Sequence, residues 1–176
     1  MPENHDKPPL IAAIQMNSSD KVEENLQTAF EQLAVARSKG AVCAALPENF
    51  AWMGHESDSP GVAERPGNGP VKDFLAQAAK ELGLWLIGGS HKLRLENDDP
   101  RISNTTLVFN PDGEQVARYD KIHLFDADVD DGNAYRESDT VRPGDALTVV
   151  NLGFARVGLS ICYDARFPAL YQALRA

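Results

Sequence analysis

The chain has 176 residues, of which 43% are hydrophobic and 24% charged, and its 17 basic and 26 acidic side chains give 17 − 26 = −9 at neutral pH. This composition excludes a disordered chain, and the negative charge argues against nucleic acid or an anionic membrane as a partner. No apolar run approaches the roughly 18–20 residues of a membrane span. The start of the chain lacks the basic and apolar regions of a signal peptide, so we expect a soluble, cytoplasmic globular protein.

The first predicted elements are a strand and a helix. Residues 1–8 are polar and predict a flexible N-terminus, and the apolar run 9–16 predicts a buried strand. Asp20, with Glu23 three residues later, predicts a capping box at the start of an amphipathic helix. Gly40 is expected to end that helix.

The middle of the chain continues this alternation. Residues 41–46 predict a second buried strand, and 50–69 are rich in Gly, Pro, Ser and Asp, which is typical of a loop. Apolar residues at helical spacing from Val71 to Leu82 predict a second helix, with Gly83 as its stop. Residues 84–89 predict a third strand.

The last part of the chain favours antiparallel strands. A strong turn signal, Asn110-Pro111-Asp112-Gly113, predicts a hairpin between 104–109 and 115–119. The remaining expected elements are, in order, an acidic loop over 126–144, strands over 147–152 and 155–161, and a helix over 166–175. Strands that first alternate with helices and then form hairpins predict an α/β fold in layers, with one domain over residues 9–176.

Three residues at predicted strand ends suggest a reactive site. Glu48 follows the second strand, Lys121 follows the hairpin, and Cys162 ends the last strand. Taken singly, each is more often a surface charge or a buried filler. Together they make coherent chemistry, because a carboxylate can accept a thiol proton and an ammonium can stabilise the thiolate or an oxyanion. The other cysteine, Cys43, lies in an apolar run, and neither cysteine fits a disulfide framework or a zinc site.

Four segments resemble the nitrilase or carbon–nitrogen hydrolase superfamily: Ala12-Ala13-Ile14-Gln15-Met16, Leu46-Pro47-Glu48-Asn49-Phe50, Tyr119-Asp120-Lys121-Ile122-His123-Leu124-Phe125-Asp126 and Gly158-Leu159-Ser160-Ile161-Cys162-Tyr163-Asp164-Ala165-Arg166-Phe167. The resemblance runs from about Pro9 to the last residue and implies an αββα sandwich. It implies that Cys162 is the nucleophile, Glu48 the general base and Lys121 the oxyanion-stabilising residue. Glu137, in Tyr135-Arg136-Glu137-Ser138, matches the second glutamate of the family, which helps to position the substrate.

Within the superfamily, the chain is most similar to the Nit-type amidases, the branch of omega-amidases and deaminated glutathione amidases. This resemblance implies hydrolysis of the terminal amide of a small carboxylate-bearing monoamide through a thioester, with release of ammonia. It implies no metal and no organic cofactor, and a homo-oligomer, a dimer, where the full domain is present. Trp52, Tyr163 and Arg166 are candidate substrate-binding residues, since a guanidinium suits a carboxylate.

Several alternatives remain open. Nitrilase and carbamoylase chemistry share the same triad. Only 14 residues follow Cys162 (176 − 162), fewer than the family places there, so we expect the C-terminal part of the sandwich to be missing. A catalytically silent relative that acts as a binding or oligomer partner is therefore the rival hypothesis. Such a shortened sandwich is expected to expose apolar surface and unpaired strand edges.

Two local patterns suggest other sites. Asp126, Asp128, Asp130 and Glu137 occupy positions one, three, five and twelve of an EF-hand loop, but Asp131 stands where that loop needs glycine, which argues against calcium. His123 and Cys162 suggest a Cys–His protease pair, but no local protease signature accompanies them.

Overall fold

The computed structural model describes residues 8–96, 99–128 and 134–175. Its helices are α1 (Val22–Ser38), α2 (Ser59–Val62), α3 (Pro70–Leu82) and α4 (Pro168–Arg175), with 3-10 turns η1 (Glu56–Asp58), η2 (Glu137–Asp139) and η3 (Cys162–Arg166). Its strands are β1 (Ile11–Ala13), β2 (Cys43–Ala45), β3 (Trp85–Ile87), β4 (His91–Arg94), β5 (Ile102–Phe109), β6 (Gln115–Asp120), β7 (Asp126–Asp128), β8 (Ala134–Arg136), β9 (Val149–Asn151) and β10 (Arg156–Gly158). The predicted flexible segment 1–8 lies outside the described residues except for Pro8.

The main sheet joins a parallel half to an antiparallel half. β1, β2 and β3 are parallel neighbours, and β3 pairs antiparallel with the far end of β5. β4 pairs with the beginning of β5 on the same edge as β3, and β6 pairs along the opposite edge. The α/β layers expected from the sequence are therefore confirmed, including the hairpin of β5 and β6.

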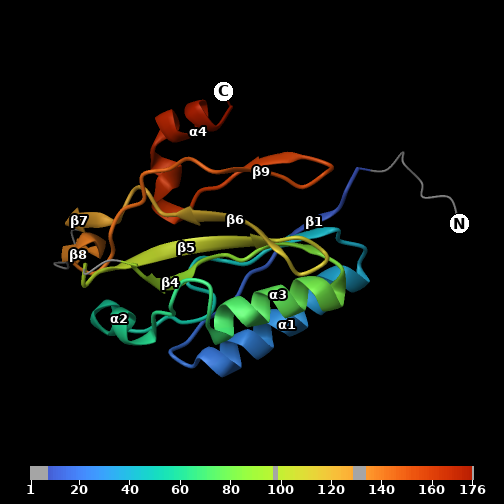
Figure 1. The fold of residues 1–176 in the computed structure, drawn as a ribbon, viewed down its shortest axis with the longest axis horizontal. Helices are drawn as coiled ribbons and strands as arrows, with labels where there is room; N and C mark the ends of the chain where they lie inside the picture. Colours follow the sequence, from blue (N-terminus) through green and yellow to red (C-terminus); the bar gives the residue numbers. More distant parts are fainter. Residues whose placement is uncertain (1–7, 97–98, 129–133, 176) are drawn as a thin grey trace, which may run out of the picture.

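Layers lie on both faces of this sheet. Figure 1 shows α1 and α3 side by side against one face, and the hairpin of β9 and β10 with α4 against the other. Alternation along the strands supplies both faces, because successive side chains of a strand point to opposite sides. In β2, Ala44 packs toward the helices and Cys43 toward the hairpin; in β5, Leu107 and Val108 divide in the same way.

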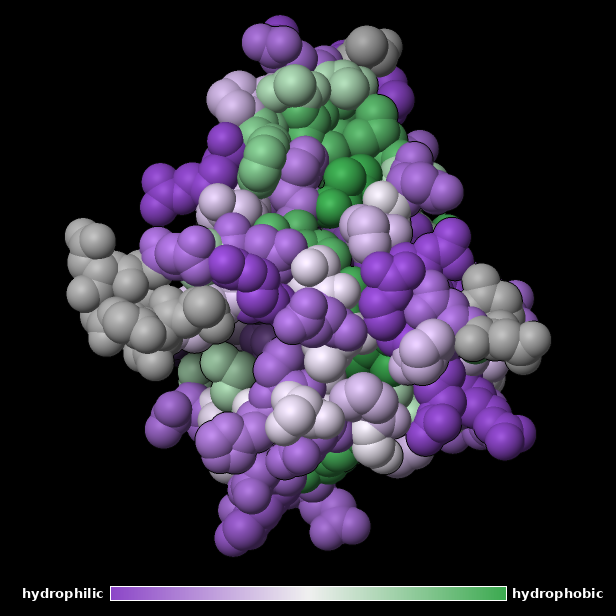
Figure 2. Space-filling model, turned by 90° about the vertical axis from the view of Figure 1, so that its left-hand side faces the viewer, coloured by the Kyte–Doolittle hydropathy of each residue, from purple (hydrophilic) through white to green (hydrophobic). Residues whose placement is uncertain are grey.

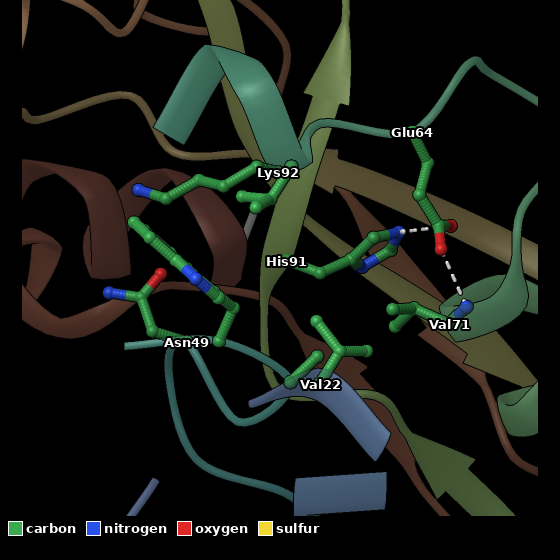
Figure 3. A pocket seen from close by; sticks show the side chains of 9 residues that line it. Val22, Asn49, Glu64, Val71, His91 and Lys92 are labelled. Carbon is green, nitrogen blue, oxygen red and sulfur yellow. Dashed lines mark hydrogen bonds and ion pairs between the residues drawn. The ribbon is translucent and has the colours of Figure 1, made fainter. Parts of the chain in front are cut away.

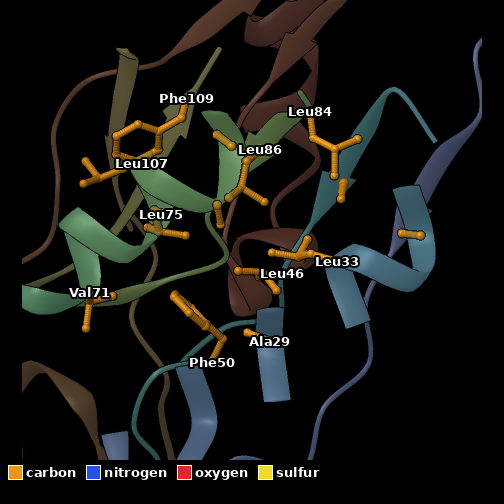
Figure 4. Close-up of a cluster of buried hydrophobic side chains, with 14 of the residues drawn as sticks. Ala29, Leu33, Leu46, Phe50, Val71, Leu75, Leu84, Leu86, Leu107 and Phe109 are labelled. Atoms are coloured by element: carbon orange, nitrogen blue, oxygen red, sulfur yellow. The ribbon is translucent and has the colours of Figure 1, made fainter. Parts of the chain in front are cut away.

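The larger core fills the space between α1, α3 and the sheet. Figure 4 shows Leu33 of α1 and Leu75 of α3 pointing toward Leu86 and the loop residue Phe50. All four side chains are buried to 1% exposure or less. Fully burying one such side chain stabilises the fold by about 1.5–3 kcal/mol. This core anchors the loop after β2, which carries Glu48.

Some local expectations were wrong. The capping box at Asp20 does not form: Lys21 is the N-cap of α1, without a side-chain cap bond. Instead the buried Asn25 accepts a hydrogen bond from the Ser19 N–H at 3.0 Å and donates to the carbonyls of Ser19 and Ala51, so tertiary contacts fix the start of the helix. The predicted loop 50–69 contains η1 and α2, and the acidic segment 126–144 contains β7, β8 and η2.

Hydrophobic side chains also reach the surface. Figure 2 shows them gathered at the upper end of the molecule, where Figure 1 places α4. Val149 of β9, Phe154 of the turn that follows and Tyr171 of α4 are 37–40% exposed. None of the helices in the described part of the chain is long and apolar enough to cross a membrane.

Candidate active site

Polar side chains from separate strands meet at one end of the main sheet. Glu48 follows β2, Lys121 follows β6, and Asn104 lies in the first half of β5. Because β5 and β6 are antiparallel, the end of β6 lies beside the beginning of β5, and the Lys121 N–H donates to the Asn104 carbonyl at 2.9 Å. The carboxyl ends of the parallel strands lie at the same end, which places Glu48 there too.

Glycine shapes the backbone under Glu48. Gly89, between β3 and β4, has φ +55°, and a Cβ at this position would lie 2.1 Å from the Pro47 carbonyl oxygen. Any other residue would therefore push the Glu48 segment away. The Ser90 N–H donates to the Pro47 carbonyl at 3.2 Å, and the Asn49 N–H donates to Ser90 Oγ at 3.0 Å. Glu48 is thus held on a loop fixed on both sides.

Lys121 is the centre of the site. Its side chain is 2% exposed, and Nζ lies 2.9 Å from Glu48 Oε1 and 2.9 Å from Glu137 Oε2. Asn104 Nδ2 donates to the same two carboxylates, at 2.9 and 3.3 Å. The Phe125 N–H donates to Glu137 Oε2 at 2.7 Å. One buried ammonium and one amide therefore hold two carboxylates apart in a fixed geometry.

Cys162 enters this site from the second layer. It begins η3 with φ +45°, a region that residues other than glycine rarely adopt, and its side chain is exposed. Asn49, next to Glu48, also has a positive φ, +55°. Strained backbone of this kind is found where the surrounding structure holds a functional group in place.

A buried carboxylate ties the Cys162 turn to the Lys121 segment. Asp164 is fully buried, and its Oδ2 accepts hydrogen bonds from Tyr119 Oη at 2.6 Å and the Ile161 N–H at 2.9 Å. Its Oδ1 accepts from the His123 N–H at 2.9 Å and lies 2.7 Å from His123 Nδ1. Tyr119 and His123 flank Lys121 in the chain, so Asp164 fixes the turn that carries Cys162 relative to the Lys121 ammonium.

The electrostatics of the site decide the resting state of the thiol. Cys162 is exposed on one side only, and its partial burial raises the pKa of the thiol; the charge and hydrogen bonding of Glu48 raise that pKa further, and Lys121 offsets only part of this. For Lys121, burial acts to lower the pKa, but the two glutamates outweigh it and raise that pKa above its usual range. Cys162 is therefore a neutral thiol beside a carboxylate and an ammonium, and a thiol of this kind becomes a nucleophile only when a base removes its proton.

Of the three residues predicted to bind substrate, Tyr163 lies beside a residue of this cluster. Tyr163 packs edge-on against Phe125 at 5.1 Å between ring centroids, beside the backbone N–H that binds Glu137. Arg166 is exposed at the end of η3. Trp52 lies on the loop after Glu48, and its ring covers Gly54, where a Cβ would lie 2.3 Å from it.

A small cavity lies behind the loop of Glu48. It has a volume of about 20 Å³, and Asn49, Trp52, His91 and Lys92 are among its lining residues (Figure 3). Such a volume holds about one water molecule, so it is too small for a substrate. Burial lowers the pKa of His91 to about 4, so its contact with Glu64, 3.9 Å between Nε2 and Oε2, is not an ion pair at neutral pH.

The alternative sites receive no support from the described residues. The His123 ring bonds to Asp164 through Nδ1 and stacks on Phe167 at 3.7 Å, which accounts for it as a structural residue. In the described ranges no group of three or more His, Cys, Asp or Glu side chains is placed to hold a metal ion. Asp130 of the EF-hand pattern lies outside these ranges, while Glu137 is bound to Lys121.

Sequence reasoning missed Asn104 and Asp164. Asn104 lies in a strand whose residues are all buried, between Ser103 and Thr105, and a buried polar side chain needs a partner. Asp164 stands two residues after Cys162 and is fully buried, which the exposed-looking Tyr-Asp-Ala-Arg context does not indicate. For Asn104 the buried polar position is a usable signal; for Asp164 only the fold reveals the partners.

The sequence of this chain is similar to those of known amidases. A family model described as carbon-nitrogen hydrolase matches residues 10–176. A deaminated glutathione amidase of Synechocystis sp. is 40% identical over 96% of this chain and 62% of its own length. The human omega-amidase NIT2 is 40% identical over 92% of this chain and 57% of its own length. The chain thus spans about three fifths of the length of these relatives.

Solved structures agree with this result. Saccharomyces cerevisiae Nit3, a member of branch 10 of the nitrilase superfamily, has a TM-score of 0.80 and 28% identity, covering 93% of this chain and 59% of its own. The Caenorhabditis elegans NitFhit protein has a TM-score of 0.79 and 30% identity, covering 94% of this chain and 40% of its own. The family match, the similar sequences and the shared architecture place this chain in the carbon-nitrogen hydrolase family.

Proposed function

We propose that the chain hydrolyses the terminal amide of a small carboxylate-bearing monoamide, with Cys162 as the nucleophile and ammonia as a product. The observation that carries this proposal is the cluster in which Lys121 bridges Glu48 and Glu137 at 2.9 Å each. In the same cluster, Glu48 is close enough to Cys162 for its charge and hydrogen bonding to raise the pKa of the thiol. The names of the relatives, deaminated glutathione amidase and omega-amidase, support an amide as the bond that is broken.

In the first half of the proposed reaction, Glu48 takes the thiol proton as Cys162 Sγ attacks the amide carbon. The carbonyl oxygen becomes an oxyanion, and the Lys121 ammonium stabilises its charge. Glu48 then passes the proton to the amide nitrogen, the C–N bond breaks and ammonia leaves. A thioester on Cys162 remains.

In the second half, Glu48 deprotonates a water molecule that attacks the thioester carbon. The C–S bond breaks, the thiol regains a proton and the carboxylic acid leaves, so the sum is amide plus water giving acid plus ammonia. Glu137 keeps Lys121 oriented throughout, since it accepts two hydrogen bonds from Nζ, at 2.9 and 3.2 Å. A raised thiol pKa suits this scheme, because Glu48 supplies the activation at the moment of attack.

A panel of monoamides tests the proposal. The 176-residue chain and its Cys162→Ala variant are incubated with C4 and C5 monoamides and with neutral aliphatic amides, and ammonia is measured. We expect ammonia release by the parent chain and none above background by the variant, with equal urea-unfolding curves. Equal ammonia release by the two proteins would show that Cys162 is not the nucleophile. No ammonia release by the folded parent chain would favour the rival hypothesis of a catalytically silent relative.

A further inference from the structure

Lys92 is a buried cation that the proposed reaction does not use. Its side chain, on strand β4, is 4% exposed, which is unusual because lysine is almost never buried without a partner. Figure 3 shows Lys92 extending to the side of the pocket on which Asn49 lies, while its neighbour His91 points to the other side, toward Glu64. The alternation of a strand accounts for this difference.

The register of the sheet directs Lys92 toward the active site. Lys92 of β4 pairs with Asn104 of β5, so the two side chains stand on the same face as direct cross-strand neighbours. Asn104 Nδ2 donates to Glu48 at 2.9 Å and to Glu137 at 3.3 Å. The Lys92 side chain therefore leaves the sheet one strand away from the residue that holds both carboxylates.

A carboxylate of the protein already occupies the position in front of Lys92. Glu56 Oε1 lies 3.4 Å from Lys92 Nζ, longer than the 2.7–2.9 Å of a strong charge-assisted bond. The same oxygen accepts a hydrogen bond from Thr140 Oγ1 at 2.9 Å, and the Thr140 N–H donates to the Glu137 carbonyl. Glu56 is 45% exposed, so water can solvate its carboxylate if another anion takes this place.

The charge of the site makes such a position necessary for an anionic substrate. Glu48, Glu137 and Lys121 sum to −1 − 1 + 1 = −1, and the whole chain carries −9. A carboxylate-bearing molecule that approached Cys162 would meet repulsion unless a cation received it. Lys92 offers an ammonium on the face of the sheet that it shares with Asn104. Thr140 offers a hydroxyl beside it, since both residues contact the same Glu56 oxygen.

We propose that Lys92 determines specificity by binding the carboxylate of the monoamide substrate in place of Glu56, with Thr140 as a second donor; this rests on the proposed function. Arg166, the cation that the sequence suggests for this task, is exposed, so water screens its charge. Lys92 is shielded from water, and its ammonium therefore interacts more strongly with an anion. The proposal makes an anion at Lys92 the feature that distinguishes substrates from neutral amides.

Succinamate and butyramide provide a matched pair of probes, because they differ only in a carboxylate against a methyl group at the far end. Binding of each is measured by calorimetry in the Cys162→Ala background, so that no turnover interferes. We expect succinamate to bind more tightly than butyramide. Lys92→Met should weaken succinamate about tenfold, the effect of losing one modest ionic contact, and leave butyramide unchanged.

Two further variants sharpen the test. Glu56→Gln removes the competing carboxylate and should tighten succinamate binding, the opposite sign to Lys92→Met. Lys92→Arg keeps the charge and should restore part of the preference for succinamate. Lys80→Met, which removes an exposed lysine on α3, controls for the change in net charge and should have no effect. Urea unfolding of each variant verifies that the fold is retained.

The outcomes separate this inference from the proposed function. Equal losses of succinamate and butyramide in Lys92→Met, or no preference for succinamate in the parent, would overturn the role of Lys92. A loss confined to succinamate in Arg166→Met, with Lys92→Met unaffected, would also overturn it and return the role to Arg166. Preferential binding that depends on Lys92, without ammonia release by the chain with Cys162 intact, would support the inference and reject the proposed hydrolysis.

Discussion

Replacing Lys121 with methionine tests the electrostatic design of the site. Met fills a similar volume but leaves Glu48 and Glu137, 24% and 11% exposed, facing each other without the ammonium between them. Removing one partner of a buried ion pair costs about 3–5 kcal/mol, and partial exposure of the glutamates favours the lower end, about 3 kcal/mol. For a chain of this size that loss lowers Tm by about 6–12 °C.

The pH dependence of this loss identifies its cause. The pKa of Lys121 is raised above its usual 10.5 in the folded state, so its stabilisation is fully present below that value and is lost only as pH rises through the raised pKa. Between about pH 5 and pH 9 the lysine itself therefore adds no slope. The deficit of the variant is therefore expected to stay constant as the pH rises toward about 9, and to shrink only above the ordinary lysine range of about 10.4.

Urea unfolding of the parent chain and Lys121→Met at about pH 7 and about pH 9 measures the deficit and its pH dependence. We expect a deficit of about 3 kcal/mol at both pH values. Lys80→Met serves as the control for removing a positive charge elsewhere. A deficit under about 1 kcal/mol, the size of a surface ion pair, would contradict this prediction, and so would a deficit that disappears at about pH 9.

Two further predictions concern the turn that carries Cys162. Glu48→Gln removes a carboxylate that raises the pKa of Cys162, so labelling of the thiol by iodoacetamide near neutral pH should become faster, although ammonia release is lost. Slower labelling would contradict this. In Asp164→Asn, an amide replaces the buried carboxylate that accepts hydrogen bonds from Tyr119 Oη and the Ile161 N–H, so the free energy of unfolding in urea should fall by about 3 kcal/mol. Tyr119→Phe removes only one of these hydrogen bonds and should cost less. An Asp164→Asn variant as stable as the parent chain would show that the network is dispensable.

Elements with strong local signals could be predicted from the sequence. α3 ends at Gly83, which adopts φ +60°, and the hairpin of β5 and β6 forms around the predicted turn of residues 110–113. In both cases one residue or turn has a backbone conformation that few alternatives allow. The resemblance of short motifs also indicated Glu48, Lys121, Glu137 and Cys162, which the fold brings to one end of the sheet.

Elements that depend on distant partners could not be predicted. Strand β4 contains the buried residues His91 and Lys92, and because both are polar the sequence lacks the apolar pattern that predicts a buried strand. The strand forms because it pairs with the beginning of β5. The start of α1 depends on Asn25, whose amide reaches the carbonyl of Ala51 across 26 positions in the chain. Such contacts override local capping preferences, and no pattern within the helix itself indicates them.

Trapping the acyl intermediate tests the central claim, that Cys162 attacks the amide carbon. The 176-residue chain is quenched in acid during turnover of succinamate, and intact-mass and peptide-mass spectra are recorded beside those of Cys162→Ala. The account predicts a single adduct, equal in mass to the acid minus water, on the peptide that contains Cys162, released by hydroxylamine and absent from the variant. Ammonia release without any adduct, or an adduct that persists in Cys162→Ala, would contradict it.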